Sequence, residues 1–113
     1  MTTLINNNQN NIWAKKKISI IGAGVSGMAA AKLGKHIGAE IFISESNDKP
    51  NNLNELKEFD FEIGNHSQKI LDADTVIISP GVSKPSKIIS DCKNNNIPII
   101  TDVFLRPQEK QSI

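Results

Sequence analysis

Residues 18–27, ISIIGAGVSG, place a short β-branched run directly before three glycines in the spacing G-x-G-x-x-G. The apolar run is typical of a buried parallel strand that ends at Gly22. An alanine-rich helix is expected to follow from about Ser26 to Ile37, with Gly38 as its stop signal. This stretch therefore predicts the strand–turn–helix unit that opens a Rossmann-like α/β domain.

Each glycine of this turn has a separate mechanical purpose. Gly22 permits the tight turn, Gly24 lets a phosphate approach the backbone, and Gly27 lets the helix pack closely on the strand. The helix N-terminus then offers unpaired amides and a partial positive charge to an anion. Ser26 is expected either to donate its hydroxyl to the ligand or to cap the helix, and the sequence leaves both open.

Outward from this unit, strands and helices continue to alternate. Further strands are predicted at 40–44 (EIFIS), 59–63, 75–78 (TVII) and 97–100, with helices at about 53–58 and 86–94. Alternation of this kind predicts a doubly wound parallel sheet of about five strands, in the order 3-2-1-4-5, with right-handed crossovers. The last strand contains Pro98, which favours an edge position.

We expect a single domain over residues 16–105. It would be flanked by a disordered polar tail at 1–15 and a polar tail at 106–113. With 113 residues, the chain has no room for a second domain.

Two loops are expected to meet at the carboxyl edge of the sheet. Glu45 ends the second strand about 20 residues after Gly22, the usual position of an acid that bonds a ribose. Ser79, Pro80 and Gly81 follow the fourth strand, and ligands of open parallel sheets bind where the strand order reverses. The glycine turn (22–27) and the loop 79–82 should therefore face one crevice. A glycine turn together with an acid at the position of Glu45 usually argues for NAD.

Four segments together resemble the N-terminal domain of the Mur ligases, above all of the members that add D-glutamate. They are IIGAGVSGMAAAKL, FISESN with its acid, ADTVIISPGV and NNNIPIITD, and they lie between about Lys17 and Asp102. The SPG loop, at its distance from the glycine turn, is the specific part of this resemblance.

The resemblance implies that the domain binds the UDP part of UDP-N-acetylmuramoyl-L-alanine and does not bind NAD. By position it puts Val25 and Ser26 on the diphosphate, and it makes Gly22, Gly24 and Gly27 the turn that holds it. It likewise places Glu45, Ser46 and Asn47 around the uracil, with Ser79, Pro80 and Gly81 closing the other side of the uridine. The family often has aspartate in place of Glu45, a basic residue in place of Asn47 and an acidic residue in place of Phe104.

The same resemblance implies a part in peptidoglycan synthesis. In the complete ligase, ATP and Mg²⁺ activate the substrate carboxylate as an acyl phosphate, which the amine of D-glutamate attacks. This chain has no G-x-x-x-x-G-K-[ST] segment, and His36 and His66 are isolated. We therefore expect no catalytic or metal-binding residues here, and a fragment or truncated form that is inactive without the central and C-terminal ligase domains.

Charge and composition narrow the partners further. The net charge of +1 favours neither nucleic acid nor an anionic membrane. Neither a transmembrane stretch nor a signal peptide is predicted, and the lone Cys92 fits a reducing compartment, so a cytoplasmic location is expected. Cys92 itself is interpreted as a core filler.

Two alternatives remain open from the sequence. The first is a stand-alone NAD-binding module, such as a redox sensor or a piece of a dehydrogenase. The second is a degenerate domain that binds nothing and serves only as a fold or interaction unit, against which the intact glycines argue.

Overall fold

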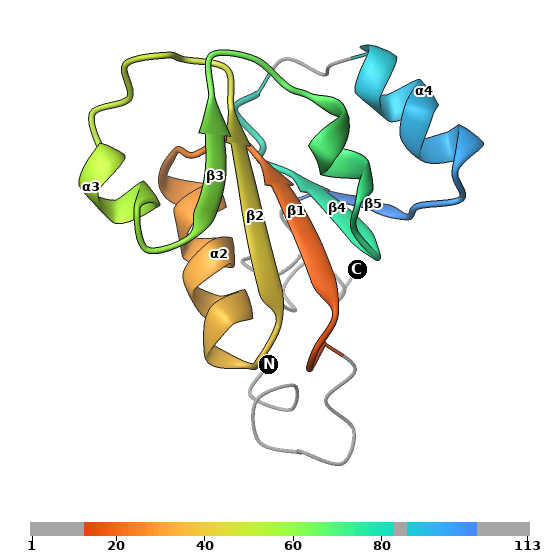
Figure 1. The fold of residues 1–113 in the computed structure, drawn as a ribbon, viewed down its shortest axis with the longest axis horizontal. Helices are drawn as coiled ribbons and strands as arrows, with labels where there is room; N and C mark the ends of the chain where they lie inside the picture. The colour runs from red at the N-terminus through yellow and green to blue at the C-terminus, as the bar shows by residue number, and fades with distance from the viewer. Residues whose placement is uncertain (1–12, 83–85, 102–113) are drawn as a thin grey trace, which may run out of the picture.

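A computed structural model of the chain describes residues 13–82 and 86–101, and it has a central parallel sheet (Figure 1). The strands are β1 (Lys17–Ile21), β2 (Glu40–Glu45), β3 (Asp60–Ile63), β4 (Thr75–Ile78) and β5 (Ile99–Thr101). All four pairings are parallel, and the spatial order is β3-β2-β1-β4-β5. The doubly wound fold and the strand order expected from the sequence are both confirmed.

Helices cover both faces of this sheet. Figure 1 shows α2 (Val25–His36) and α3 (Leu53–Leu56) on one face, with η2 (Gln68–Leu71) and α4 (Ser86–Asn94) on the other. Because side chains alternate along a strand, β1 supplies both layers: Ile18 and Ile20 belong to the α2 cluster, and Ile21 belongs to the α4 cluster. The central position of β1 explains why it reads as a continuous apolar run.

The connection from β3 to β4 differs from the other crossovers. Between them the chain forms only the single 3₁₀ turn η2, which the sequence did not predict. The segment 64–74, GNHSQKILDAD, has one adjacent pair of large aliphatic residues and no apolar stripe of helical period. The buried hydroxyl of Ser19 donates to the carbonyl of Ile70 at 2.9 Å, which fastens this turn to β1.

The ends of the described chain also follow from local chemistry. β5 begins only at Ile99 because Pro98 has no N–H to give, although its carbonyl still accepts from Val76 at 3.0 Å. At the other end Trp13 packs against the α2 cluster, and the Lys15 amide donates to Gly38 at 2.9 Å. The ordered structure thus begins no later than Trp13. Residues 1–12, Phe104 and the tail 106–113 lie outside the described residues.

Candidate nucleotide site

The glycine turn between β1 and α2 has the geometry that its spacing predicts. Gly22 has φ +102°, a left-handed conformation that glycine adopts without strain. A Cβ on Gly27 would collide with the Gly22 carbonyl oxygen and would lie 2.6 Å from the Ser79 hydroxyl oxygen. These two glycines therefore let the helix begin directly against the end of β1.

Gly24 has a different environment. A Cβ built on it would meet no protein atom within 4 Å, so the space beside it is open to a ligand. Gly24 is the N-cap of α2, and no side chain caps the helix. The first turn of α2 contains no acidic residue. The amides of Val25 and Ser26 therefore have no intrahelical acceptor, and both residues line the open space beside Gly24.

This geometry decides one of the alternatives left open for Ser26. The residue lies inside the helix after Gly24 and is half-buried, so the capping interpretation is wrong. Its hydroxyl remains available as a donor. Val25, beside it, is 91% exposed at the helix start.

The loop after β4 lies against this turn, as expected. Ser79 is buried, its amide donates to Ile21 at 3.0 Å, and its hydroxyl donates to the Gly22 carbonyl at 3.2 Å. The hydroxyl of Ser79 therefore holds the two loops together. A Cβ on Gly81 would meet nothing within 4 Å, which leaves open space on the ligand side of this loop as well.

Glu45 is anchored by the protein itself. Its Oε1 accepts from the Ala23 amide at 2.7 Å, and its Oε2 accepts from the Asn47 amide at 2.8 Å. Each carboxylate oxygen has a second lone pair, so both can still accept a hydrogen bond from a ligand. The acid thus connects β2 to the glycine turn and retains acceptor capacity toward the crevice.

These elements enclose a cavity of about 720 Å³ at the carboxyl edge of the sheet. Its lining includes eight of the predicted site residues: Gly22, Gly24, Val25, Ser26, Glu45, Ser46, Ser79 and Gly81. His66 and Val82 line it too. Val82 belongs to the loop expected to face the crevice, whereas His66 was not predicted. We call this space the crevice cavity.

The remaining predicted residues lie around it. Gly27 is buried, Pro80 is exposed, and neither is among the residues that line the cavity. Asn47 lines a neighbouring cavity of about 410 Å³ beside α3, which shares Gly24, Val25 and Glu45 with the first. There the Asn52 amide group donates to the Ala23 carbonyl at 2.8 Å, so both polar groups of Ala23 are held by side chains.

His66 is the residue that the sequence reasoning missed. It is isolated from other histidines and from cysteines in the sequence, but its Nδ1 lies 2.7 Å from the Ser44 hydroxyl oxygen. The same hydroxyl donates to Glu62 at 2.6 Å. The available signal was the strand before it: β3 ends at Ile63, so the following residues must lie at the carboxyl edge with the other loops.

Glu62 is the best-satisfied carboxylate of this region. It also accepts from the amide and the hydroxyl of Ser67, at 2.8 and 2.5 Å. Burial raises the pKa of Glu62, but these hydrogen bonds, with a contribution from the charge of His66, outweigh it and hold the pKa below its usual range. Glu62 is therefore ionised at neutral pH.

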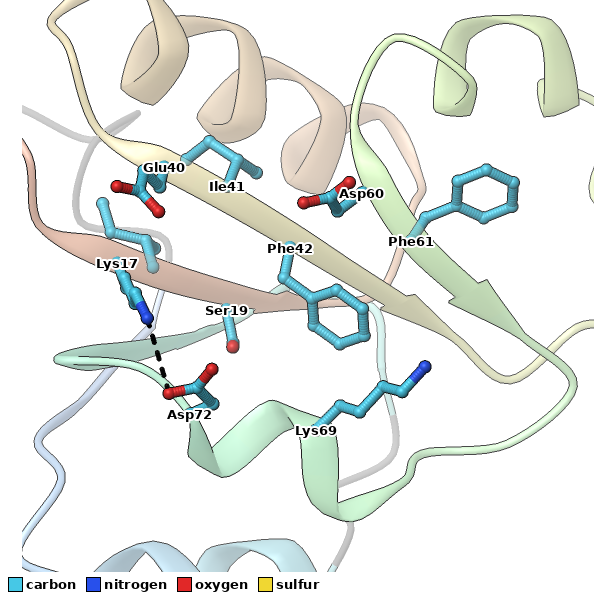
Figure 2. A pocket seen from close by; sticks show the side chains of 10 residues that line it. Lys17, Ser19, Glu40, Ile41, Phe42, Asp60, Phe61, Lys69 and Asp72 are labelled. Atoms are coloured by element: carbon cyan, nitrogen blue, oxygen red, sulfur yellow. Dashed lines mark ion pairs between the residues drawn. The ribbon is translucent and has the colours of Figure 1, made fainter.

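A separate hollow of about 530 Å³ lies toward the opposite end of the sheet, on the side left open by the short η2 turn. Figure 2 shows Phe42 standing on the sheet between Ser19 and Lys69. An exposed ion pair between Lys17 and Asp72, 3.7 Å apart, closes one side of the hollow. Lying away from the carboxyl edge, it does not include the glycine turn and is not the expected ligand site.

Within residues 13–82 and 86–101, no group of three metal-binding side chains comes together. In the same part of the chain, no helix is long and apolar enough to cross a membrane. Cys92 is fully buried, and burial, with the nearby charge of Asp91, raises the pKa of its thiol. Its environment fits the predicted role as a core filler.

Comparison with known proteins gives a consistent result. Residues 16–101 match the family model of the Mur ligase MurD-like N-terminal domain. Curated relatives named UDP-N-acetylmuramoylalanine--D-glutamate ligase include those of Pelodictyon phaeoclathratiforme (35% identical, covering 80% of this chain), Elusimicrobium minutum (37%, 78%) and Bacteroides thetaiotaomicron (38%, 78%). The chain spans about a fifth of the length of these relatives: 20%, 20% and 21%.

Among solved structures, SirC, a precorrin-2 dehydrogenase, is similar with a TM-score of 0.55. The match covers 77% of this chain and 44% of that one, at 12% sequence identity. This likeness is one of fold, and it agrees with the Rossmann-like arrangement of the sheet and helices.

Proposed function

This chain belongs to the MurD-like N-terminal domain family of the Mur ligases, and we propose that it binds the uridine diphosphate of UDP-N-acetylmuramoyl-L-alanine in the crevice cavity. The observation that carries the proposal is the combination of open space at Gly24 with the uncapped start of α2. Unpaired amides at a helix N-terminus favour an anion through hydrogen bonding and the helix dipole. The diphosphate is the anion that the family's substrate brings.

We propose that the uridine lies on the other side of the same cavity, next to Glu45. Glu45 is negatively charged and repels phosphate, but its spare lone pairs accept from a ribose hydroxyl or from the uracil N–H. Ser46 and Gly81 line the space next to it. Asn47 contributes through its backbone, because its amide orients the Glu45 carboxylate.

Bond formation is assigned to other domains of the ligase. We propose that this domain presents the nucleotide end of the substrate, while ATP and Mg²⁺ activate the distant carboxylate in the central and C-terminal domains. The 113-residue chain by itself is therefore expected to hydrolyse no ATP and to ligate no D-glutamate. Family membership also supports a cytoplasmic location, where ATP and nucleotide-linked precursors are available.

A titration followed by NMR tests this proposal. UDP-N-acetylmuramoyl-L-alanine should shift the backbone signals of Gly24, Ser26 and Gly81, while NADH at the same concentration should leave them in place. Binding should be weak, since the rest of the substrate would be held by the other domains. If NADH shifts these signals and the uridine nucleotide does not, the chain is a dinucleotide-binding module instead.

A further inference from the structure

His66 reaches the crevice cavity because the chain turns back immediately after β3. Gly64, with φ +93°, makes this turn, and its amide donates to the carbonyl of Glu45 at 2.8 Å. The loop is thereby held to the end of β2, the strand that carries the predicted uridine contact. His66 is half-buried there and forms part of the cavity wall.

The hydrogen bonds around Ser44 fix the tautomer of the ring. An ionised Glu62 can only accept, so the single hydroxyl proton of Ser44 goes to Glu62 at 2.6 Å. The same oxygen must then accept from His66, 2.7 Å away, so Nδ1 of the imidazole carries a proton. The contact from Ser44 to the Asn65 carbonyl is longer, at 3.4 Å, and does not compete.

With Nδ1 committed to Ser44, Nε2 is the ring nitrogen that remains for a ligand. Neutral imidazole presents Nε2 as an acceptor, whereas imidazolium presents it as a charged donor. Two carboxylates lie in this region: Glu62 bonds the Ser44 hydroxyl that contacts the ring, and Glu45 lines the same cavity.

The choice between neutral imidazole and imidazolium matters because of the other charges in the cavity. Among its described lining residues, Glu45 is acidic, His66 can become positive, and there is no lysine or arginine. A diphosphate diester adds two negative charges to the space that already contains Glu45. Protonation of His66 is the available way for these described side chains to compensate that charge.

We propose that His66 is a ligand-binding residue whose imidazolium donates from Nε2 to the nucleotide bound in the crevice cavity, so that nucleotide binding takes up a proton at this side chain. The proposal rests on the proposed function and deepens it. Ser44 and Glu62 act as positioning residues: Ser44 contacts the ring, and Glu62 fixes the direction of the Ser44 hydroxyl and thereby the tautomer of the ring. Affinity should then increase as the pH falls through the histidine range.

Calorimetry of the full chain tests the proposal with UDP-N-acetylmuramoyl-L-alanine, whose diphosphate diester does not itself titrate between about pH 5 and 8. We expect binding to be roughly three- to tenfold tighter at the lower end of this range than at the upper end. Heats measured near neutral pH in two buffers of unlike ionisation enthalpy should reveal net proton uptake. Affinity that is independent of pH, with no proton uptake, would overturn the proposal.

Two variants test whether His66 is the source of the pH dependence and of the proton uptake. His66→Gln should abolish both the pH dependence and the proton uptake, whereas His36→Gln, an exposed histidine at the far end of α2, should retain them. If His66→Gln keeps the pH dependence of the unmodified chain, His66 is not the group that titrates.

A measurement on the unmodified chain does not depend on the variant folding. The NMR titration of the His66 ring should move to higher pH in the presence of the nucleotide, and the free chain should show the Nδ1–H tautomer. A titration unchanged by bound nucleotide would overturn the proposal. No nucleotide binding at any pH would refute the proposed function, and with it this inference.

Discussion

The carboxylate of Glu45 accepts a hydrogen bond of 2.7 Å from the backbone amide of Ala23, so the end of β2 is tied to the glycine turn that follows β1. The neighbouring Gly22 amide donates to the Ser44 carbonyl at 2.8 Å and continues the pairing of the two strands. The turn is therefore shaped by the protein before a ligand arrives. In a Rossmann-like domain that binds NAD, the acid at this position is expected on a ribose; here it also has a structural task.

Replacement of Glu45 by Gln should lower both stability and affinity. The amide group of Gln would set a donor against the donor of Ala23 or of Asn47, so one of these two bonds is lost. We expect a loss of about 1–3 kcal/mol in nucleotide binding, with a lower melting temperature. Calorimetry and thermal unfolding measure the two effects. Glu40→Gln, at the exposed opposite end of β2, is the matched control and should change neither.

Alanine at the second and third glycines of the turn should separate binding from folding. Gly24→Ala meets no protein atom, so its melting temperature should fall only slightly, because alanine is a poorer N-cap than glycine, while the new methyl group obstructs the phosphate. Gly27→Ala collides with the Gly22 carbonyl and should cost about 1–3 kcal/mol of folding free energy or more. Thermal unfolding combined with a nucleotide titration distinguishes them. Equal destabilisation by both variants would contradict this assignment.

A side chain at Gly81 should weaken uridine binding and leave the fold intact. The space around a Cβ at this position is empty for at least 4 Å, and the residue lines the crevice cavity. Gly81→Val should therefore unfold at the same temperature as the unmodified chain but bind the nucleotide more weakly. Retention of full affinity would show that the uridine does not occupy the space beside the SPG loop.

Glu62 should make the domain lose stability in acid. Its pKa is lower in the folded chain than in the unfolded chain, so its contribution is complete above the unfolded pKa and disappears as the pH falls through the folded pKa. Stability should thus decline as the pH drops below about 4. Glu62→Gln should be less stable at neutral pH and should lose less on acidification. Denaturant unfolding at several pH values measures this, and parallel pH curves for the two proteins would refute it.

The local pattern of residues was sufficient to predict much of the fold and the glycine turn of the candidate site. Gly22 and Gly27 could be assigned because their purposes depend on backbone geometry and on packing between adjacent elements. The strand order followed from the alternation of strands and helices and from the handedness of their crossovers. The short turn η2 was not predictable in the same way, since it is held by a long-range bond from Ser19 to Ile70.

What the sequence alone determined is thus the Rossmann-like framework and the place of the glycine turn, because both arise from interactions between near neighbours and from the period of the apolar residues. The tertiary structure alone decided how the side chains at the crevice are used. Ala23 and Glu45 are 22 residues apart, as are Ser44 and His66, and each pair meets only because the register of β1, β2 and β3 brings their carboxyl ends to one edge. Whether two groups form a hydrogen bond depends on differences of a few tenths of an ångström in their separation. These separations are set by the packed sheet and not by spacing along the chain.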